Sequence, residues 1–141
     1  MKLTLKSIFT IHAVILLIYG LMDLFAAESA LSMFGEGTAA NAPMLLMIRM
    51  MGATFLSLAV LTWFMRDAHL SRGRRAGLFA LAVGNVIAAF LQIMAITAGT
   101  INEMNWVGVL VSASFALAYI FYGNKEHKML TEKEARDKVK A

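Results

Sequence analysis

The stretch MLLMIRMMGATFLSLAVLTWF, residues 44–64, decides the fold because it contains a single charged side chain, Arg49. About 20 predominantly apolar residues in a helix span the roughly 30 Å hydrocarbon core of a bilayer. Three further runs of this kind occur, at Ile8–Ala27, Gly77–Ala98 and Trp106–Tyr122. The sequence therefore predicts an all-α integral membrane protein, a four-helix bundle with short loops.

The composition supports a membrane protein. Of the 141 residues, 60% are hydrophobic and 16% are charged, and the mean hydropathy is +0.69. A soluble domain of this size needs a larger charged fraction to cover its surface. The chain has no cysteine, which excludes disulfides, thiol redox catalysis and thiolate metal sites.

The basic residues predict the orientation. Twelve of the thirteen Lys and Arg residues lie before the first run, between the second and third, or after the fourth. With four spans, these segments share one side of the membrane, and the opposite loops carry only acidic charges. The positive-inside rule therefore places both termini in the cytoplasm, and we expect a multi-pass protein of the bacterial plasma (inner) membrane. The same rule accounts for the pI near 9.6 without a nucleic-acid partner.

The chain divides into a predicted four-span domain, residues 1–123, and a charged cytoplasmic tail, residues 124–141. The tail is rich in Lys and Glu, and several pairs have the i, i+4 spacing of helical ion pairs. We expect a solvated helix or a frayed end. Aromatic side chains near the ends of the spans predict interfacial belts, with Trp106 on the outer side and Trp63, Tyr119 and Tyr122 on the inner side.

Three polar side chains inside the runs fall at nearly the same depth. At about 1.5 Å per residue, Asp23 lies about 22 Å from the inner start of the first span. Arg49 lies about 8 Å below the outer start of the second span, and Gln92 is at a matching level in the third. Because an unpaired charge at such a depth is costly, we predict an Asp23–Arg49 ion pair, direct or through one water, with Gln92 as a hydrogen-bond partner. The alternative for Arg49 is that its side chain extends outward to the nearby membrane surface.

Helical spacing adds Tyr19 and Asn85 to this cluster. His12, Tyr19 and Asp23 share one face of the first span, and Asn85 and Gln92 share one face of the third. Small residues on the other spans allow close helix approach, namely Gly52, Ala53, Gly108 and Ser112. We expect these faces to point into the bundle, where the cluster either fixes helix register or binds a ligand or ion.

No catalytic residue, metal site or cofactor is predicted. The chain lacks the His-Glu-x-x-His, Gly-x-Ser-x-Gly and phosphate-loop motifs. An enzymatic role is therefore not expected. For His12, a packed histidine is the first interpretation, and an axial ligand to haem or a chlorophyll-type pigment is the second. Ligation of haem by two His residues would need another intramembrane histidine.

The segment RMMGATFLSLAVLTWFMR, residues 49–66, resembles the second span of small uncharacterised bacterial four-helix membrane proteins, in the DoxX-like and DUF4345-like group. The shared features are an Arg, a pair of small residues and a Leu- and Ala-rich run. This resemblance implies the four-span fold, and it implies no particular chemistry, because families of this type share none.

Three functions fit these observations. The first is a non-enzymatic membrane protein whose outer-side polar cluster binds a small or lipid-like molecule. The second is an accessory subunit of a larger membrane complex, such as a respiratory or photosynthetic assembly. The third is a small oligomeric transporter. Because the bundle encloses little volume and the loops are short, we expect a homo-oligomer or a partner complex in the lipid bilayer.

Overall fold

The computed structural model describes residues 4–35 and 41–140, which form helices and no strand. The prediction of an all-α fold is therefore confirmed for the described residues. Four helices are long and apolar enough to cross a membrane. They are α1, α3, α4 and α5, and the complete order is α1 (Leu5–Phe25), α2 (Ala27–Ser32), α3 (Ala42–Met65), α4 (Arg72–Thr97), the 3-10 helix η1 (Glu103–Asn105) and α5 (Trp106–Lys140).

Polar side chains set the starts of three long helices. The side chain of Thr4 accepts a hydrogen bond from the Ser7 N–H at 3.2 Å, and Asn41 and Ser71 cap α3 and α4 in the same way. A side-chain acceptor at this position satisfies one of the backbone donors that a helix start leaves free. The caps explain why helices begin several residues before the apolar runs do.

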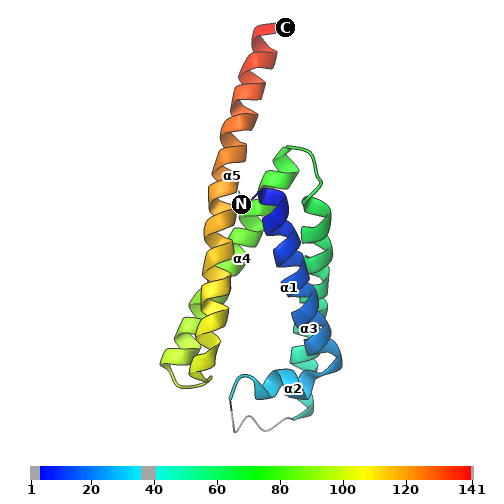
Figure 1. The fold of residues 1–141 in the computed structure, drawn as a ribbon, viewed down its shortest axis with the longest axis vertical. Helices are drawn as coiled ribbons and strands as arrows, with labels where there is room; N and C mark the ends of the chain where they lie inside the picture. The colour runs from blue at the N-terminus through cyan, green and yellow to red at the C-terminus, as the bar shows by residue number, and fades with distance from the viewer. Residues whose placement is uncertain (1–3, 36–40, 141) are drawn as a thin grey trace.

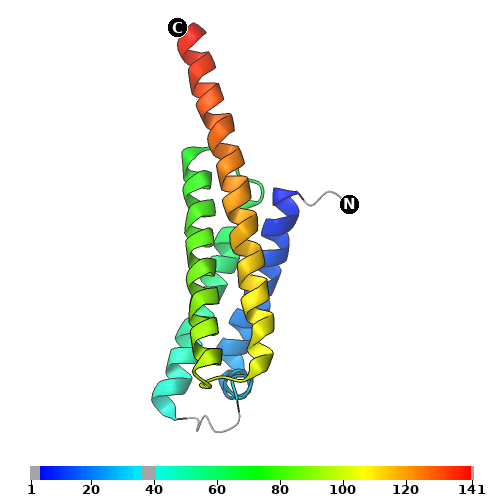
Figure 2. The ribbon, with the colours of Figure 1, turned by 90° about the vertical axis from the view of Figure 1, so that its left-hand side faces the viewer.

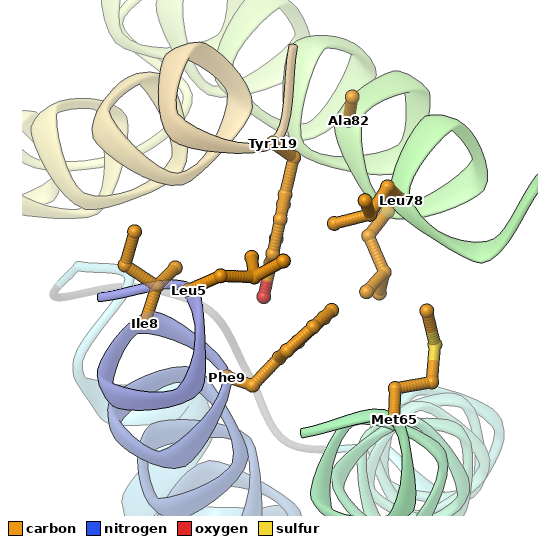
Figure 3. Close-up of a cluster of buried hydrophobic side chains, with 8 residues drawn as sticks. Leu5, Ile8, Phe9, Met65, Leu78, Ala82 and Tyr119 are labelled. Atoms are coloured by element: carbon orange, nitrogen blue, oxygen red, sulfur yellow. The ribbon is translucent and has the colours of Figure 1, made fainter. Parts of the chain in front are cut away.

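The long helices form two antiparallel hairpins, α1 with α3 and α4 with α5 (Figure 1). The hairpins pack together at the end where α1 and α4 begin. We call it the basic end, because Lys6, Arg66 and Arg74 lie there. Figure 3 shows side chains from all four helices pointing toward one another in this shared core. Its buried members are Leu5, Ile8, Phe9, Met65, Leu78, Leu81, Ala82 and Tyr119.

Toward the opposite end, the α2 end, the two hairpins separate (Figure 1). The hydrophobic cluster there is built from the first hairpin and α2, with Ala27, Ala30, Leu31 and Ile48 at its centre. The hairpins are joined again beyond it, since Asn102 N–H donates to the Phe34 carbonyl at 2.9 Å. We call the part between the shared core and this link the splayed region.

Helix α5 does not end with the bundle. It continues without interruption to Lys140, so its last turns project past the basic end (Figures 1 and 2). The charged tail predicted from residue 124 is therefore helical over its described residues. At about 1.5 Å per residue, this 35-residue helix is about 52 Å long, well over the thickness of a hydrocarbon core.

Candidate functional site

Asp23 lies where α1 and α3 come close together. A Cβ atom added to Gly52 would lie 2.8 Å from the Asp23 Cβ and 2.9 Å from the Gly20 carbonyl oxygen. A Cβ added to Gly20 would in turn lie 3.0 Å from the Gly52 carbonyl oxygen. The two glycines thus let the helix backbones meet. The prediction that Gly52 permits close helix approach is confirmed, whereas its neighbour Ala53 is exposed.

The Asp23 carboxyl group is buried without a complete set of partners. The residue is 3% exposed, and its Oδ2 atom has no hydrogen-bond partner in the part of the chain that the structure describes. Burying a polar atom without a hydrogen bond costs free energy, and such atoms are few in folded proteins. Asp23 is therefore the strongest candidate for a group that meets a ligand.

Arg49 does not neutralise Asp23. The predicted direct ion pair is wrong, because neither side chain forms a salt bridge or hydrogen bond among the described residues, and Arg49 is exposed. The reason is the direction in which the Arg49 side chain leaves α3. Leu58 of α3 packs on the shared core, and it follows Arg49 by nine residues, or about half a turn in azimuth at 100° per residue. Arg49 therefore points away from the second hairpin, and it also lies about 60° around α3 from Gly52, the position that meets Asp23.

Gln92 also belongs to a different contact from the one predicted. Its Oε1 atom lies directly over Gly108, where a Cβ would collide with it. This arrangement confirms Gly108 as a site of close approach, but within the α4–α5 hairpin. Asn85 donates from Nδ2 to the Leu81 carbonyl in its own helix at 2.8 Å. The expected hydrogen bond from Gln92 to the Asp23–Arg49 pair is absent among the described residues.

The stripe predicted on α1 does face the second hairpin. Its first member, His12, contacts Tyr119 of α5. Tyr19 follows His12 by seven residues and so lies on the same face two turns farther along. There it is 44% exposed, because the hairpins have separated. Asp23 lies one further turn along this face, at the edge that also meets Gly52. Tyr19 thus faces the splayed region, and Asp23 lies beside that region, buried against α3.

The second hairpin brings polar residues to the same region. Asn85 follows Leu78 of the shared core by seven residues, and Gln92 follows Asn85 by seven. On α5, Ser112 precedes Tyr119 by seven residues. Residues two turns apart share a helix face, so all three lie on faces that meet the first hairpin at the basic end. The Gln92 side chain nevertheless turns to Gly108 of α5, and Asn85 bonds to Leu81 of its own helix, so the contacts of both lie within the second hairpin.

His12 forms a buried polar contact that sequence reasoning missed. Its Nδ1 atom lies 2.6 Å from the Tyr119 hydroxyl oxygen, and the Phe115 ring stacks on the imidazole at a centroid distance of 4.1 Å. Tyr119 is 0% exposed, so its ring faces the core of the bundle, and its predicted depth near the inner interface stays a prediction. The spacing of Phe115, Tyr119 and Tyr122 along one helix face was the available signal. This face of α5 is buried because α1 packs on it.

Glu126 is a second residue whose role the sequence did not reveal. The tail interpretation left it in solvent, but it is buried, with Oε1 lying 3.0 Å from Arg74 Nε. Arg74 also donates from Nη1 to the Ala68 carbonyl. Because Glu126 follows Tyr119 by seven residues, it lies on the same face of α5. The pair fastens the projecting helix to the start of α4.

No group of three or more His, Cys, Asp or Glu side chains able to hold a metal occurs in residues 4–35 and 41–140. The haem or pigment interpretation of His12 stays a prediction. In the structure, one ring nitrogen of this residue is engaged by Tyr119 and one ring face by Phe115. The contacts of His12 are therefore those of a residue that joins the hairpins.

Residues 1–123 match the model of a family described as a domain of unknown function, DUF8292, and the chain belongs to that family. No curated protein and no solved structure matches the chain. The resemblance to DoxX-like and DUF4345-like proteins has no counterpart in these comparisons and stays a prediction.

Proposed function

We propose that the chain is a non-enzymatic, multi-pass protein of the bacterial plasma membrane that binds a small amphiphilic molecule in its splayed region. The molecule enters sideways from the lipid, and its polar head reaches Asp23. Both termini, and with them the basic end, lie on the cytoplasmic side. The α2 end then belongs to the outer leaflet.

The orientation rests on the charges at the two ends. The basic end carries Lys6, Arg66, Arg72, Arg74 and Arg75, and the described residues near the α2 end carry no Lys or Arg apart from Arg49. Basic residues in short loops favour the cytoplasm. A reporter fused to the C-terminus that requires the cytoplasm should be active. Activity of a reporter that functions only outside the cytoplasm would contradict the proposed orientation.

The observation that carries the proposed ligand is the unpartnered Oδ2 atom of Asp23. An ionised carboxylate in hydrocarbon is costly unless it is paired or hydrogen-bonded. A ligand with an ammonium or another hydrogen-bond donor would supply the missing partner, and charge-assisted hydrogen bonds are the stronger ones. The proposed ligand class is therefore an amphiphile with a cationic or donor-rich head.

The surroundings of Asp23 fit such a molecule. The shared core bounds the splayed region at one end, and the Asn102–Phe34 hydrogen bond bounds it at the other. Between them the half-exposed Tyr19 ring offers both an apolar face and a hydroxyl group. A hydrocarbon chain can therefore stay in the lipid while the head makes polar contacts between the hairpins.

The test measures binding of a spin-labelled primary alkylammonium probe, whose N–H groups can donate to Asp23, to the full chain in phosphatidylcholine nanodiscs. An alkyl sulfate probe of the same chain length is the charge control. We expect saturable binding of the cationic probe that weakens about tenfold or more in Asp23→Asn, since a charge-assisted bond contributes about 1.5–3 kcal/mol. Asp67→Asn removes an acidic group at the basic end and should leave binding unchanged.

Two results would contradict the proposal. One is equal binding of both probes, or equal binding by wild type and Asp23→Asn. The other is a protein that copurifies after mild solubilisation and protects Tyr19 from the aqueous and lipid phases. The second result would favour the accessory-subunit function, because another chain would then fill the splayed region.

A further inference from the structure

Each hairpin carries an apolar groove on the side that faces away from the other hairpin. The groove of the first hairpin lies between α1 and α3 and includes Val14, Val60 and Trp63. The groove of the second lies between α4 and α5 and includes Phe79, Val83 and Ile120. Both are lined by apolar side chains, and both have an aromatic residue toward the basic end.

An arginine lies over the aromatic ring of each groove. The Arg66 guanidinium carbon is 3.6 Å from the Trp63 ring centroid, and the Arg75 carbon is 5.4 Å from that of Phe79. The two arginines differ in their partners. Arg66 Nε lies 2.7 Å from Asp67 Oδ2, so a carboxylate of the chain already neutralises it.

Arg75 has no such partner. Its Nε atom is buried without a hydrogen bond, and none of the described residues forms an ion pair with it. A guanidinium is always charged and presents its N–H donors in a fork that matches phosphate. Its neighbour Arg74 is engaged by Glu126. The α4–α5 groove thus ends at the Arg75 guanidinium, which no carboxylate of the described residues neutralises.

From this difference we infer that the α4–α5 groove is a binding site for an anionic phospholipid of the leaflet at the basic end. The Arg75 guanidinium holds the phosphate, and an acyl chain lies along Phe79, Val83 and Ile120. The α1–α3 groove lacks this preference, because Asp67 occupies Arg66. The site is separate from the splayed region and does not depend on a ligand at Asp23.

The dimensions agree with a lipid in one leaflet. Phe79 lies seven residues from the start of α4 at Arg72, or about 10 Å, and Ile87 at the far end of the groove lies about 22 Å from it. One leaflet contributes about half of the roughly 30 Å hydrocarbon core. The groove therefore begins below the headgroup level and extends to about the middle of the bilayer. Asn124 of α5, one turn beyond Ile120, adds an exposed amide near the head.

Native mass spectrometry of the delipidated full chain tests this site. The chain is titrated with phosphatidylglycerol and phosphatidylcholine of identical acyl chains. We expect wild type to retain phosphatidylglycerol with about tenfold preference, the factor that 1.4 kcal/mol of binding free energy produces. Arg75→Gln should lose the preference, and Arg66→Gln, the matched arginine over an aromatic ring, should keep it. Val83→Trp, which fills the groove, should reduce retention of both lipids.

Inorganic phosphate added during the titration separates a lipid site from a simple anion site. We expect phosphatidylglycerol to stay bound, because its acyl chain contributes in the groove. Displacement by phosphate, equal losses in Arg75→Gln and Arg66→Gln, or equal retention of the two lipids by wild type would each overturn the inference. The wild-type comparison decides the question by itself if a variant does not fold.

Discussion

Replacing Gly52 by Ala should separate the two helices of the first hairpin. The added Cβ would lie 2.8 Å from the Asp23 Cβ and from the Leu24 backbone nitrogen. Ordinary contacts begin at 3.4 Å, so α1 and α3 must move apart by about 0.6 Å (3.4 minus 2.8). Overpacking of this kind costs about 1–3 kcal/mol, and the better helix propensity of Ala offsets about 0.5–1 kcal/mol. We expect a net loss of about 1–2 kcal/mol.

Two other glycine variants provide reference values for the loss of unfolding free energy in Gly52→Ala. At Gly20 the nearest atoms, at 2.9 Å, belong to the Leu56 side chain, which can rotate, and the nearest backbone atom, the Gly52 carbonyl oxygen, is 3.0 Å away, so Gly20→Ala should cost less. At Gly84 no atom lies within 4 Å of the added Cβ, so Gly84→Ala should be neutral or should stabilise by up to about 1 kcal/mol. Denaturant unfolding in one detergent, followed by circular dichroism, gives the three free energies of unfolding on one scale.

The order of the three variants is the decisive result. If Gly52→Ala unfolds at the same denaturant concentration as Gly84→Ala, the backbones at Gly20 and Gly52 are not in contact. The burial of Asp23 between α1 and α3 would then lose its basis. A smaller loss in Gly52→Ala than in Gly20→Ala would contradict the tighter backbone contact at Gly52.

Two further predictions concern the basic end. Tyr119→Phe should lower the free energy of unfolding by about 1–3 kcal/mol, because His12 Nδ1 loses its partner in a buried site. The double variant Tyr119→Phe with His12→Leu should lose less than the sum of the two single losses. Additive losses in the same assay would contradict the pairing. Hydrogen bonds from Lys6 and Arg66 hold the pKa of Asp67 below its ordinary value of 3.8. The stabilisation is therefore complete above the unfolded pKa and declines as the pH falls toward the folded pKa. Melting temperatures from about pH 5 to about pH 3 should decline less in Asp67→Asn than in wild type, and parallel curves would contradict this assignment.

The fold was largely predictable because hydrophobic length is a one-dimensional signal. The run Met44–Phe64 became α3, Ala42–Met65, with differences of two residues and one. The predicted third span, Gly77–Ala98, begins five residues later than α4, because Ser71 caps that helix inside the basic segment. A run of apolar residues reports the part of a helix inside the hydrocarbon. It does not report polar turns that extend the helix on either side.

The candidate site was less predictable, because depth and direction are separate quantities. The rise per residue placed Asp23 and Arg49 at one level, but pairing also requires that both side chains point toward each other. That direction is fixed by which face of α3 packs on α1. The sequence signal for it was Gly52, whose face lies about 60° from Arg49 at 100° per residue. For Tyr119, aromatic character near a span end suggested an interface, although its partner His12 lies on a distant helix.

Polar contacts between helices that are distant in sequence lie at the basic end of the bundle, although Arg74 Nε, Arg75 Nε and Glu126 Oε2 there have no hydrogen-bond partner among the described residues. At the basic end, His12 meets Tyr119 and Arg74 meets Glu126, and each contact joins helices that are far apart in sequence. These contacts and the shared core are sufficient to hold the hairpins together there. Beside the splayed region, Asp23 keeps an unpartnered oxygen within the described residues, although a Leu at that place would avoid the cost of burying a polar group. The contacts at the basic end do not involve Asp23, and the ligand that we propose would supply the missing partner of its buried carboxyl group.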